Sequence, residues 1–240
     1  MSRLLSTSRT GPVTGDPPPL PAQAARRLSA IQHRAATLAL AALYRAGVER
    51  PDAIIANTAL GCLDDTERFL ADMRDAKGAL LSPLPFMRST HNTMAGQLAL
   101  MLGCHGPNIT HSQGLNGFHA ALAEAELMLH EHPKMKVLVL AIDERTDLLA
   151  SVAATLDVTT TVGQGGEAFV LAGDTEDVPC IARMGWQNGA TARLLLPLAE
   201  RPVHGSVVAE GLGSLLGEGL RAPVVLSGGD PSTALLISPC

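Results

Sequence analysis

Apolar residues recur every three or four positions in several stretches of the chain, which is the spacing of one buried face of an α-helix. The first stripe runs from Leu28 to Ala42 and stops at Gly47, a residue that suits a helix end. A second helix is capped by Asp64 or Asp65. Three of its apolar residues are expected to face inward: Phe69, Leu70 and Met73. Three further helices are expected: one capped by Ser89 or Thr90, one over Gly114–His130 and one over Ser206–Leu220.

Short apolar runs without helical spacing lie between these helices. The clearest is Val137–Ile142, a continuous run typical of a strand buried on both faces. Seven other short strands are expected: Leu4–Ser8, Ala53–Thr58, Asn108–Thr110, Glu167–Leu171, Ile181–Met184, Val224–Leu226 and Thr233–Ile237. Residues 78–87 contain prolines and are expected to form a loop. The alternation of strands and helices predicts a layered α/β domain with a mixed sheet between helices.

The domain organisation follows from where this alternation begins. Residues 1–21 are rich in Ser, Gly and Pro, so we expect a flexible Pro-rich N-terminal arm there. Residues 22–240 show no internal repeat or convincing linker and are expected to form a single domain. With 46% hydrophobic and 17% charged residues, the whole chain has the composition of a well-packed globular protein.

Charge and cysteine content narrow the functional classes. The net charge is −5 and aromatic residues make up 2%, so the chain lacks the basic, aromatic-rich surface of a nucleic-acid-binding protein. Its four cysteines are far apart and include no CxxC pair, which favours reduced thiols in a cytoplasmic protein. The longest uncharged apolar run, Ala35–Tyr44, is about half a membrane span, so no membrane span is expected.

Several residues could carry chemistry by themselves. Ser112 lies in Thr-His-Ser-Gln-Gly, which lacks only the first glycine of the nucleophile elbow of serine hydrolases. His130 and His132 flank a glutamate, but they lie at the expected end of a helix before Pro133, where a solvated terminus is the simpler interpretation. We therefore expect no metal site and no cofactor.

The stretch Asn92–Gly114, NTMAGQLALMLGCHGPNITHSQG, resembles β-ketoacyl synthases of the thiolase-like fold. In that family an Asn-x-x-Ala-Gly-Gln helix leads through Gly-Pro, here Gly106-Pro107, into a strand. A turn then presents the nucleophilic cysteine at a helix N-terminus. Gly163–Leu171 and Leu226–Ile237 resemble two later glycine-rich segments of the family. The resemblance implies a truncated thiolase-like fold, the N-terminal half of a ketosynthase.

The resemblance also implies which catalytic groups are missing. The position of the nucleophilic cysteine holds His111 or, with the alignment shifted by one residue, Ser112. The family uses two downstream histidines, and the only late histidine here is His204, in a poorly matching context. The implied organisation is an N-terminal core over residues 22–175 and a shortened C-terminal remnant over residues 176–240. Catalytic residues are therefore not expected.

Ser82-Pro83 and Phe86 further resemble a short branch of the family, the chain-length factor-like proteins of bacterial aryl polyene and flexirubin-type pigment pathways. The implied function is a non-catalytic subunit that forms a heterodimer with an active ketosynthase and shapes its acyl tunnel. An acyl carrier protein would reach this subunit only indirectly. Two alternatives remain open: a residual enzyme, acting as a malonyl-carrier-protein decarboxylase or as an acyltransferase through Ser112, and a homodimer that binds an acyl chain without reacting.

The family's dimer geometry implies roles for individual residues. The strand before the nucleophile pairs with its twin across the dimer axis, which places Asn108, Ile109 and Thr110 at the interface. Met94, on the preceding helix, would reach the partner's acyl tunnel. Ser112 would cap the fourth helix. Arg26, Arg27 and Arg34 are expected to share one helix face, which is either simply solvated or able to contact an acidic carrier protein.

Overall fold

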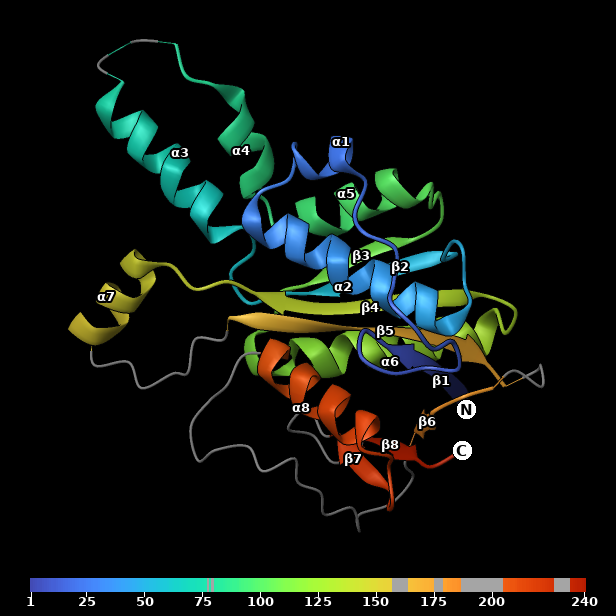
Figure 1. Ribbon diagram of the computed structural model, residues 1–240. Helices are drawn as coiled ribbons and strands as arrows, with labels where there is room; N and C mark the ends of the chain where they lie inside the picture. The colour runs from blue at the N-terminus through green and yellow to red at the C-terminus, as the bar shows by residue number, and fades with distance from the viewer. Residues whose placement is uncertain (77, 79, 157–163, 175–178, 187–204, 227–233) are drawn as a thin grey trace.

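A computed structural model describes the chain except residues 77, 79, 157–163, 175–178, 187–204 and 227–233. The strands are β1 (Ser2–Thr7), β2 (Ala53–Asn57), β3 (Asn108–His111), β4 (Lys136–Asp143), β5 (Gly165–Gly173), β6 (Ala182–Trp186), β7 (Val224–Leu226) and β8 (Leu235–Ser238). They form one eight-stranded sheet in the order β3-β2-β4-β5-β1-β6-β8-β7 (Figure 1). Strands β3, β2 and β4 run parallel, whereas the other neighbouring pairs are antiparallel. The expectation of a mixed sheet is confirmed.

Helices cover both faces of this sheet. They are α1 (Ala22–Ala25), α2 (Ala30–Ala46), α3 (Leu63–Asp75), α4 (Pro83–Ser89), α5 (Thr93–Leu102), the 3₁₀ turn η1 (Gly114–Asn116), α6 (Gly117–Glu131), α7 (Asp147–Thr155) and α8 (Gly205–Gly217). Helices α2 and α5 lie on one face, and α6 and α8 lie on the other (Figure 1). The short helices α1 and α7 have no counterpart among the helices expected from the sequence.

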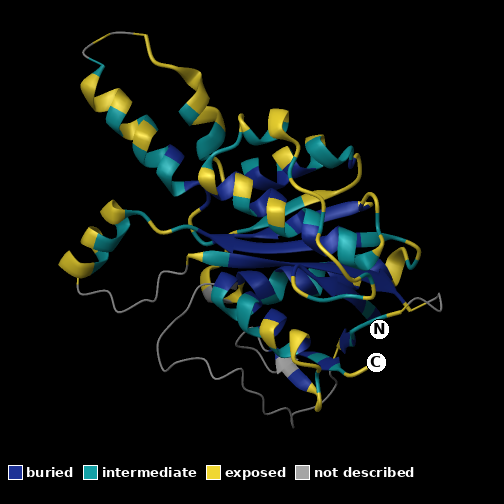
Figure 2. Cartoon of the chain, viewed as in Figure 1, coloured by how far each residue is buried: buried dark blue, intermediate teal, exposed yellow. Residues whose placement is uncertain are grey.

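The alternation of side chains along the central strands builds one core on each face of the sheet. In β4, Leu138 and Leu140 join the core beneath α2 and α5, whereas Val137 and Val139 join the core against α6 and α8. Successive side chains of a strand point to opposite faces, so a continuous apolar run is what a strand between two helical layers requires. Figure 2 shows the central strands β2, β4 and β5 almost entirely buried, with exposed residues on the outer helices.

The N-terminal segment contains one of the expected strands. Residues 2–7 are an inner strand of the sheet, paired with β5 on one side and with β6 on the other, where a strand over Leu4–Ser8 was expected within the Pro-rich arm. Leu4 contributes to one core and Leu5 to the other, at 0% and 1% exposure. Because β1 bridges β5 and β6, the expected remnant after residue 175 contributes strands to the same sheet as the core. The boundaries at residues 21 and 175 stay predictions.

Several expectations about helices are wrong. The N-cap residue of α3 is Cys62 instead of Asp64 or Asp65, and that of α5 is Asn92 instead of Ser89 or Thr90.

Residues 83–89 form helix α4, although a loop was expected, and Pro83 suits the first position of a helix because it has no N–H to satisfy. Leu70 and Met73 of α3 are 56% and 50% exposed instead of facing inward. The chain turns between α1 and α2, so Arg26, at the end of α1, does not share a helix face with Arg34.

The cysteines also depart from expectation. Cys180 and Cys240, which flank the paired strands β6 and β8, form a disulfide with their Cα atoms 6.2 Å apart. Cys62 and Cys104 are free and buried. The expectation that all four thiols are reduced is therefore wrong for this pair, because the antiparallel pairing of β6 with β8 brings together two residues 60 positions apart. In the described part of the chain, no helix is long and apolar enough to cross a membrane.

Candidate functional site at the carboxyl ends of the parallel strands

The candidate site lies where the three parallel strands end. Asn57, His111 and Asp143 are the last residues of β2, β3 and β4, and the pairing of β2 with both neighbours brings them to one edge of the sheet. In open α/β sheets the carboxyl ends of parallel strands are the usual place for ligands and catalytic groups. The candidate residues His111 and Ser112 both lie at this edge.

Ser112 is exposed and its hydroxyl already has an acceptor. Its Oγ donates a hydrogen bond to the main-chain carbonyl of Ala59, at 3.1 Å. A nucleophilic serine needs a basic side chain within hydrogen-bond reach to accept its proton, usually a histidine. A peptide carbonyl cannot accept that proton in a reaction. The geometry therefore describes a positioned serine and not an activated one.

His111 is held by its backbone. Its carbonyl oxygen accepts hydrogen bonds from Asn57 Nδ2, at 3.3 Å, and from the N–H of Thr58, at 3.1 Å. The ring atom Nε2 is buried and has no hydrogen-bond partner among the described residues. Burial lowers the pKa of His111, and the charge of Glu124 opposes this only in part, so the neutral ring is favoured near neutral pH.

The start of the fourth helix differs from the expectation. Helix α6 begins at Gly117 after the 3₁₀ turn η1, and its N-cap residue is Asn116. Ser112 therefore does not cap this helix, because its hydroxyl reaches back to the loop after β2. A Cβ atom at Gly117 would lie 2.0 Å from Asn57 Nδ2. A glycine is required there for α6 to approach the end of β2 so closely.

The two free thiols lack the surroundings of a nucleophilic cysteine. Cys62 is the N-cap residue of α3, a position where the helix dipole favours a thiolate. Burial nevertheless raises the pKa of Cys62 to about 12, and the charges of Glu144 and Asp65 add to this effect. Cys104 is 7% exposed and packs in the core beneath α2 and α5. Neither thiol combines exposure with an environment that stabilises a thiolate.

Asp143 joins the loops around this edge. Its carboxylate, 3% exposed, accepts hydrogen bonds from the Ala59 N–H at 2.7 Å, from Thr58 Oγ1 at 3.1 Å and from Ser206 Oγ at 2.6 Å. Ala59 is also the residue whose carbonyl accepts from Ser112. The end of β4 thus fixes the loop after β2, the start of α8 and, through that loop, the orientation of Ser112.

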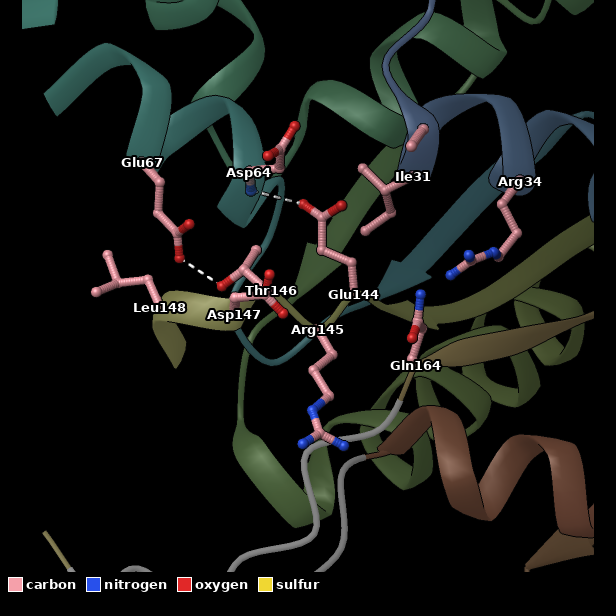
Figure 3. Close-up of a pocket in the computed structure, with 11 residues that line it drawn as sticks. Ile31, Arg34, Asp64, Glu67, Glu144, Arg145, Thr146, Asp147, Leu148 and Gln164 are labelled. Carbon is pink, nitrogen blue, oxygen red and sulfur yellow. Dashed lines mark hydrogen bonds between the residues drawn. The ribbon is translucent and has the colours of Figure 1, made fainter. Parts of the chain in front are cut away.

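A pocket of about 440 Å³ opens beside this network, at the starts of α2, α3 and α7 (Figure 3). Glu144 lies in it and accepts a hydrogen bond from the Asp64 N–H at 3.0 Å, which caps α3. Across the pocket, Glu67 accepts from Thr146 Oγ1 at 2.5 Å. Thr146 in turn accepts from the N–H of Leu149 and caps α7. These polar groups hold helix ends together, and the Thr146 hydroxyl that donates to Glu67 also serves as the cap of α7.

The predicted interface residues lie on an edge strand. In the described part of the chain β3 pairs with β2 alone, so its other side is an open edge. Ile109 and Thr110 are partly exposed, and Asn108 is tied to α5 through a hydrogen bond from its Nδ2 to the Ala95 carbonyl at 2.8 Å. Met94 is only 1% exposed and packs in its own chain's core. Roles for these four residues at a partner stay predictions.

Sequence reasoning missed a buried carboxylate. Glu167 lies in β5 at 0% exposure and accepts hydrogen bonds from the N–H and the hydroxyl of Ser8 and from Arg9 Nε, the last at 2.7 Å. The signal in the sequence that could have revealed Glu167 was an acidic residue inside an apolar run.

His204 lies outside the described residues. The described residues contain no group of three or more His, Cys, Asp or Glu side chains that could hold a metal ion.

Comparison with solved structures identifies the fold. A chain in the complex of the ketosynthase ApeO with its chain length factor ApeC, from Xenorhabdus doucetiae, superposes with a TM-score of 0.63 and 22% identity, covering 93% of this chain and 83% of that one. The ishigamide ketosynthase/chain length factor gives 0.55 and 18%, covering 74% of this chain and 54% of that one. A β-ketoacyl synthase from Burkholderia phymatum STM815 gives 0.58 and 15%, with 77% and 56% covered.

The fraction of each matched chain that this chain covers differs between the three structures. The matched chain of the ApeO–ApeC complex is only a little longer than this chain, whereas this chain spans about half of the other two. No curated protein matches the sequence. The model of the β-ketoacyl synthase N-terminal domain matches residues 6–162, which include β2 to β4 and the candidate site at their ends. The chain therefore belongs to the β-ketoacyl synthase family, through its N-terminal domain.

Proposed function

We propose that this chain is a non-catalytic, chain-length factor-like subunit that pairs with an active ketosynthase in bacterial polyketide-type biosynthesis, of the aryl polyene kind, and shapes its acyl tunnel. The observation that carries this proposal is the end of β3. A condensing enzyme needs a thiolate there, whereas this chain has His111 and a Ser112 hydroxyl that donates to a carbonyl. The superposition on a chain from a complex of a ketosynthase with its chain length factor supports the subunit interpretation.

The open edge of β3 supports pairing. An exposed edge strand presents unpaired N–H and C=O groups and readily pairs with another strand. Ile109 and Thr110 lie on this edge strand, and the helices α5 and α6 pack against it. An antiparallel pairing of β3 with the equivalent strand of a ketosynthase would cover these groups. The carrier protein would then meet this subunit only through its partner.

Residual enzymatic activity is the second candidate, as a malonyl-carrier-protein decarboxylase or an acyltransferase that uses Ser112. The observation in its favour is that Ser112 is exposed at the edge where the family places its nucleophile. Against it, the Ser112 hydroxyl has no base as acceptor among the described residues. An acyl adduct on Ser112 after incubation with acyl-carrier protein would establish this second function.

Co-expression with a full-length ketosynthase from the same pathway tests the proposal. We expect the two chains to purify together as a 1:1 heterodimer. Ile109→Asp should abolish co-purification, because it introduces a charge into the centre of the paired edge. Leu148→Asp, at an exposed residue of α7, is the matched control and should leave the complex intact. A wild-type chain that stays monomeric beside the ketosynthase would overturn the proposal, whereas a homodimer that binds acyl chains would establish the remaining alternative.

A further inference from the structure

The disulfide between Cys180 and Cys240 joins the ends of two paired strands. Arg183 of β6 lies opposite Ser238 of β8, and the same antiparallel register, continued along both strands, puts Cys240 opposite Ile181, the neighbour of Cys180. The two Cα atoms are 6.2 Å apart, which is within the usual range for a disulfide. The bond therefore fixes the end of β8 to the start of β6.

The two cysteines differ in their access to solvent. Cys240 is exposed, whereas Cys180 is partly buried and packs against the core beneath α2 and α5. A thiol that attacks a disulfide must reach one of its two sulfur atoms, and Cys240 is the accessible side of this bond. Exposed disulfides are typically labile or regulatory, whereas structural disulfides resist reduction by glutathione. The exposure of Cys240 therefore favours a bond that opens and closes.

The outer strands of the sheet depend on this junction. In the described part of the chain β7 pairs with β8 alone, and β8 joins the rest of the sheet through β6 (Figure 1). The disulfide links residues 60 positions apart, and a cross-link of this span reduces the conformational entropy gained when the strands separate. Loss of the bond should therefore increase how often β8 separates from β6.

Apolar packing limits what the opening of this bond can do. Leu235 and Ile237 of β8 are 0% exposed and lie in the core against α6 and α8. The start of α8 has an attachment of its own, because Ser206 Oγ donates to Asp143 at 2.6 Å. The expected change is thus local: β7 and β8 open more often, while the central sheet and the start of α8 stay in place.

We propose that Cys180–Cys240 is a reversible redox site at which small thiols open the bond and small disulfides, such as oxidised glutathione, close it. In the opening direction a thiolate attacks Cys240 Sγ, the bond to Cys180 Sγ breaks, and Cys180 leaves as a thiolate that takes up a proton. A second small thiolate attacks the small-molecule sulfur of the mixed disulfide, which releases Cys240 as a thiol and forms a small disulfide. Two small thiols thus supply the two electrons that the protein takes up.

The first test equilibrates the purified chain in a series of buffers from fully reduced to fully oxidised glutathione. N-ethylmaleimide then labels accessible thiols without denaturant, and intact mass gives the number of labels. We expect labelling of both Cys180 and Cys240 in reduced buffers, none in oxidised buffers, and the same midpoint from either direction. Cys62 and Cys104 are buried free thiols and should stay unlabelled throughout. A bond that resists every reduced buffer, or reduced cysteines that never pair, would overturn the proposal.

The second test compares amide hydrogen exchange in the oxidised and the reduced chain. Amides of β7 and β8 should exchange at least about tenfold faster in the reduced chain, while those of α3, on the opposite side of the molecule (Figure 1), should stay within about twofold. Cys240→Ser should match the reduced chain in every buffer. Pro239→Ala is the matched control at the adjacent exposed residue, keeps both cysteines, and should respond to glutathione like the wild type.

Equal exchange of β7 and β8 in both states would contradict the proposal, because the bond would then not stabilise these strands. Equally faster exchange in α3 would also contradict it, because the bond would then stabilise the whole fold and not the outer strands. Neither measurement needs a ketosynthase, so a failure here is distinguishable from a failure of the proposed function.

Discussion

The starts of α3 and α6 each meet one of the two requirements for a nucleophilic thiol. Helix α3 has a cysteine at its N-cap, but burial and the charges of Glu144 and Asp65 raise the pKa of Cys62 to about 12. The approach to α6 has the exposed position at the edge of the sheet, but Ser112 stands there. The comparison teaches that neither a thiol at a helix N-terminus nor an open position is sufficient. Reactivity needs both in one place.

Placing a thiol on the approach to α6 should combine exposure with a helix N-terminus, and its effect on the rate of thiol alkylation is the largest that we expect. At pH 8, Ser112→Cys should react with iodoacetamide at least about 1,000-fold faster than Cys62, because an ordinary thiol is partly ionised there and one with a pKa of about 12 is not. Peptide mapping by mass spectrometry measures both rates. Wild-type chain should show no fast-reacting thiol, since Cys180 and Cys240 are bonded to each other. Fast labelling of Cys62 would contradict this prediction.

The single variants Ser112→Cys and His111→Cys should each accept an acyl group from acyl-carrier protein. Neither should form a β-ketoacyl product without the ketosynthase. Carbon–carbon bond formation also needs donors for the developing oxyanion, each worth about 100- to 1,000-fold in rate. The family resemblance implies two histidines for this purpose after residue 175, and the sequence has one there, His204. A condensation product from the isolated variant would show that residues after 175 rebuild the missing machinery.

Asp143 holds the loop between β2 and α3, to which Ser112 also bonds, so its removal should loosen the approach to both helices. In Asp143→Ala the Ala59 N–H and the hydroxyls of Thr58 and Ser206 lose a buried acceptor. We expect a loss of about 3–5 kcal/mol in the free energy of unfolding, measured by urea titration. Asp147→Ala removes an exposed carboxylate from the first turn of α7 and should cost less than about 1 kcal/mol. Equal losses in both variants would show that Asp143 does not organise this edge.

Replacing Glu144, which lies beside the start of α3, should change how the free energy of unfolding depends on pH. This is the smallest effect that we expect. Burial raises the pKa of Glu144, although the hydrogen bond from the Asp64 N–H opposes this shift. A carboxyl whose pKa is raised on folding binds its proton more tightly in the native state, so this group's contribution to stability falls as pH rises through and above the ordinary glutamate range. Glu144→Gln should remove that dependence, with a difference of about 1 kcal/mol or less between pH 4 and 7.

Unfolding curves of the wild type and of Glu144→Gln at several pH values measure this difference directly. The pKa of Cys62 should also fall in the variant, because the charge of Glu144 contributes to its rise. It should stay above the ordinary thiol range, since burial is the larger cause. A difference curve between the two proteins that rises with pH in favour of the wild type would contradict the prediction.

The local pattern of apolar residues was sufficient to predict a strand that is buried on both faces of the sheet. The run Val137–Ile142 marked β4, observed over Lys136–Asp143, because a strand between two helical layers must be apolar on both sides. Val224–Leu226 matched β7. The family resemblance led to the edge strand β3 and to a nucleophile position without cysteine. The sequence pattern did not reveal the role of the buried Glu167, because its partners Ser8 and Arg9 lie about 160 positions away in the sequence.

The amino-acid sequence by itself determined that this is an α/β protein that resembles ketosynthases, because spacing and residue identity are local properties. That His111 or Ser112 takes the place of the nucleophilic cysteine stays a prediction from this resemblance. Only the tertiary structure decided which apolar stripes are covered, why Ser112 bonds to the Ala59 carbonyl instead of capping a helix, and that Cys62 has its pKa raised. It also decided that Cys180 reaches Cys240 and that Arg88 lies against Arg27. Burial, electrostatic environment and pairing depend on neighbours from distant parts of the chain, and no local pattern specifies those neighbours.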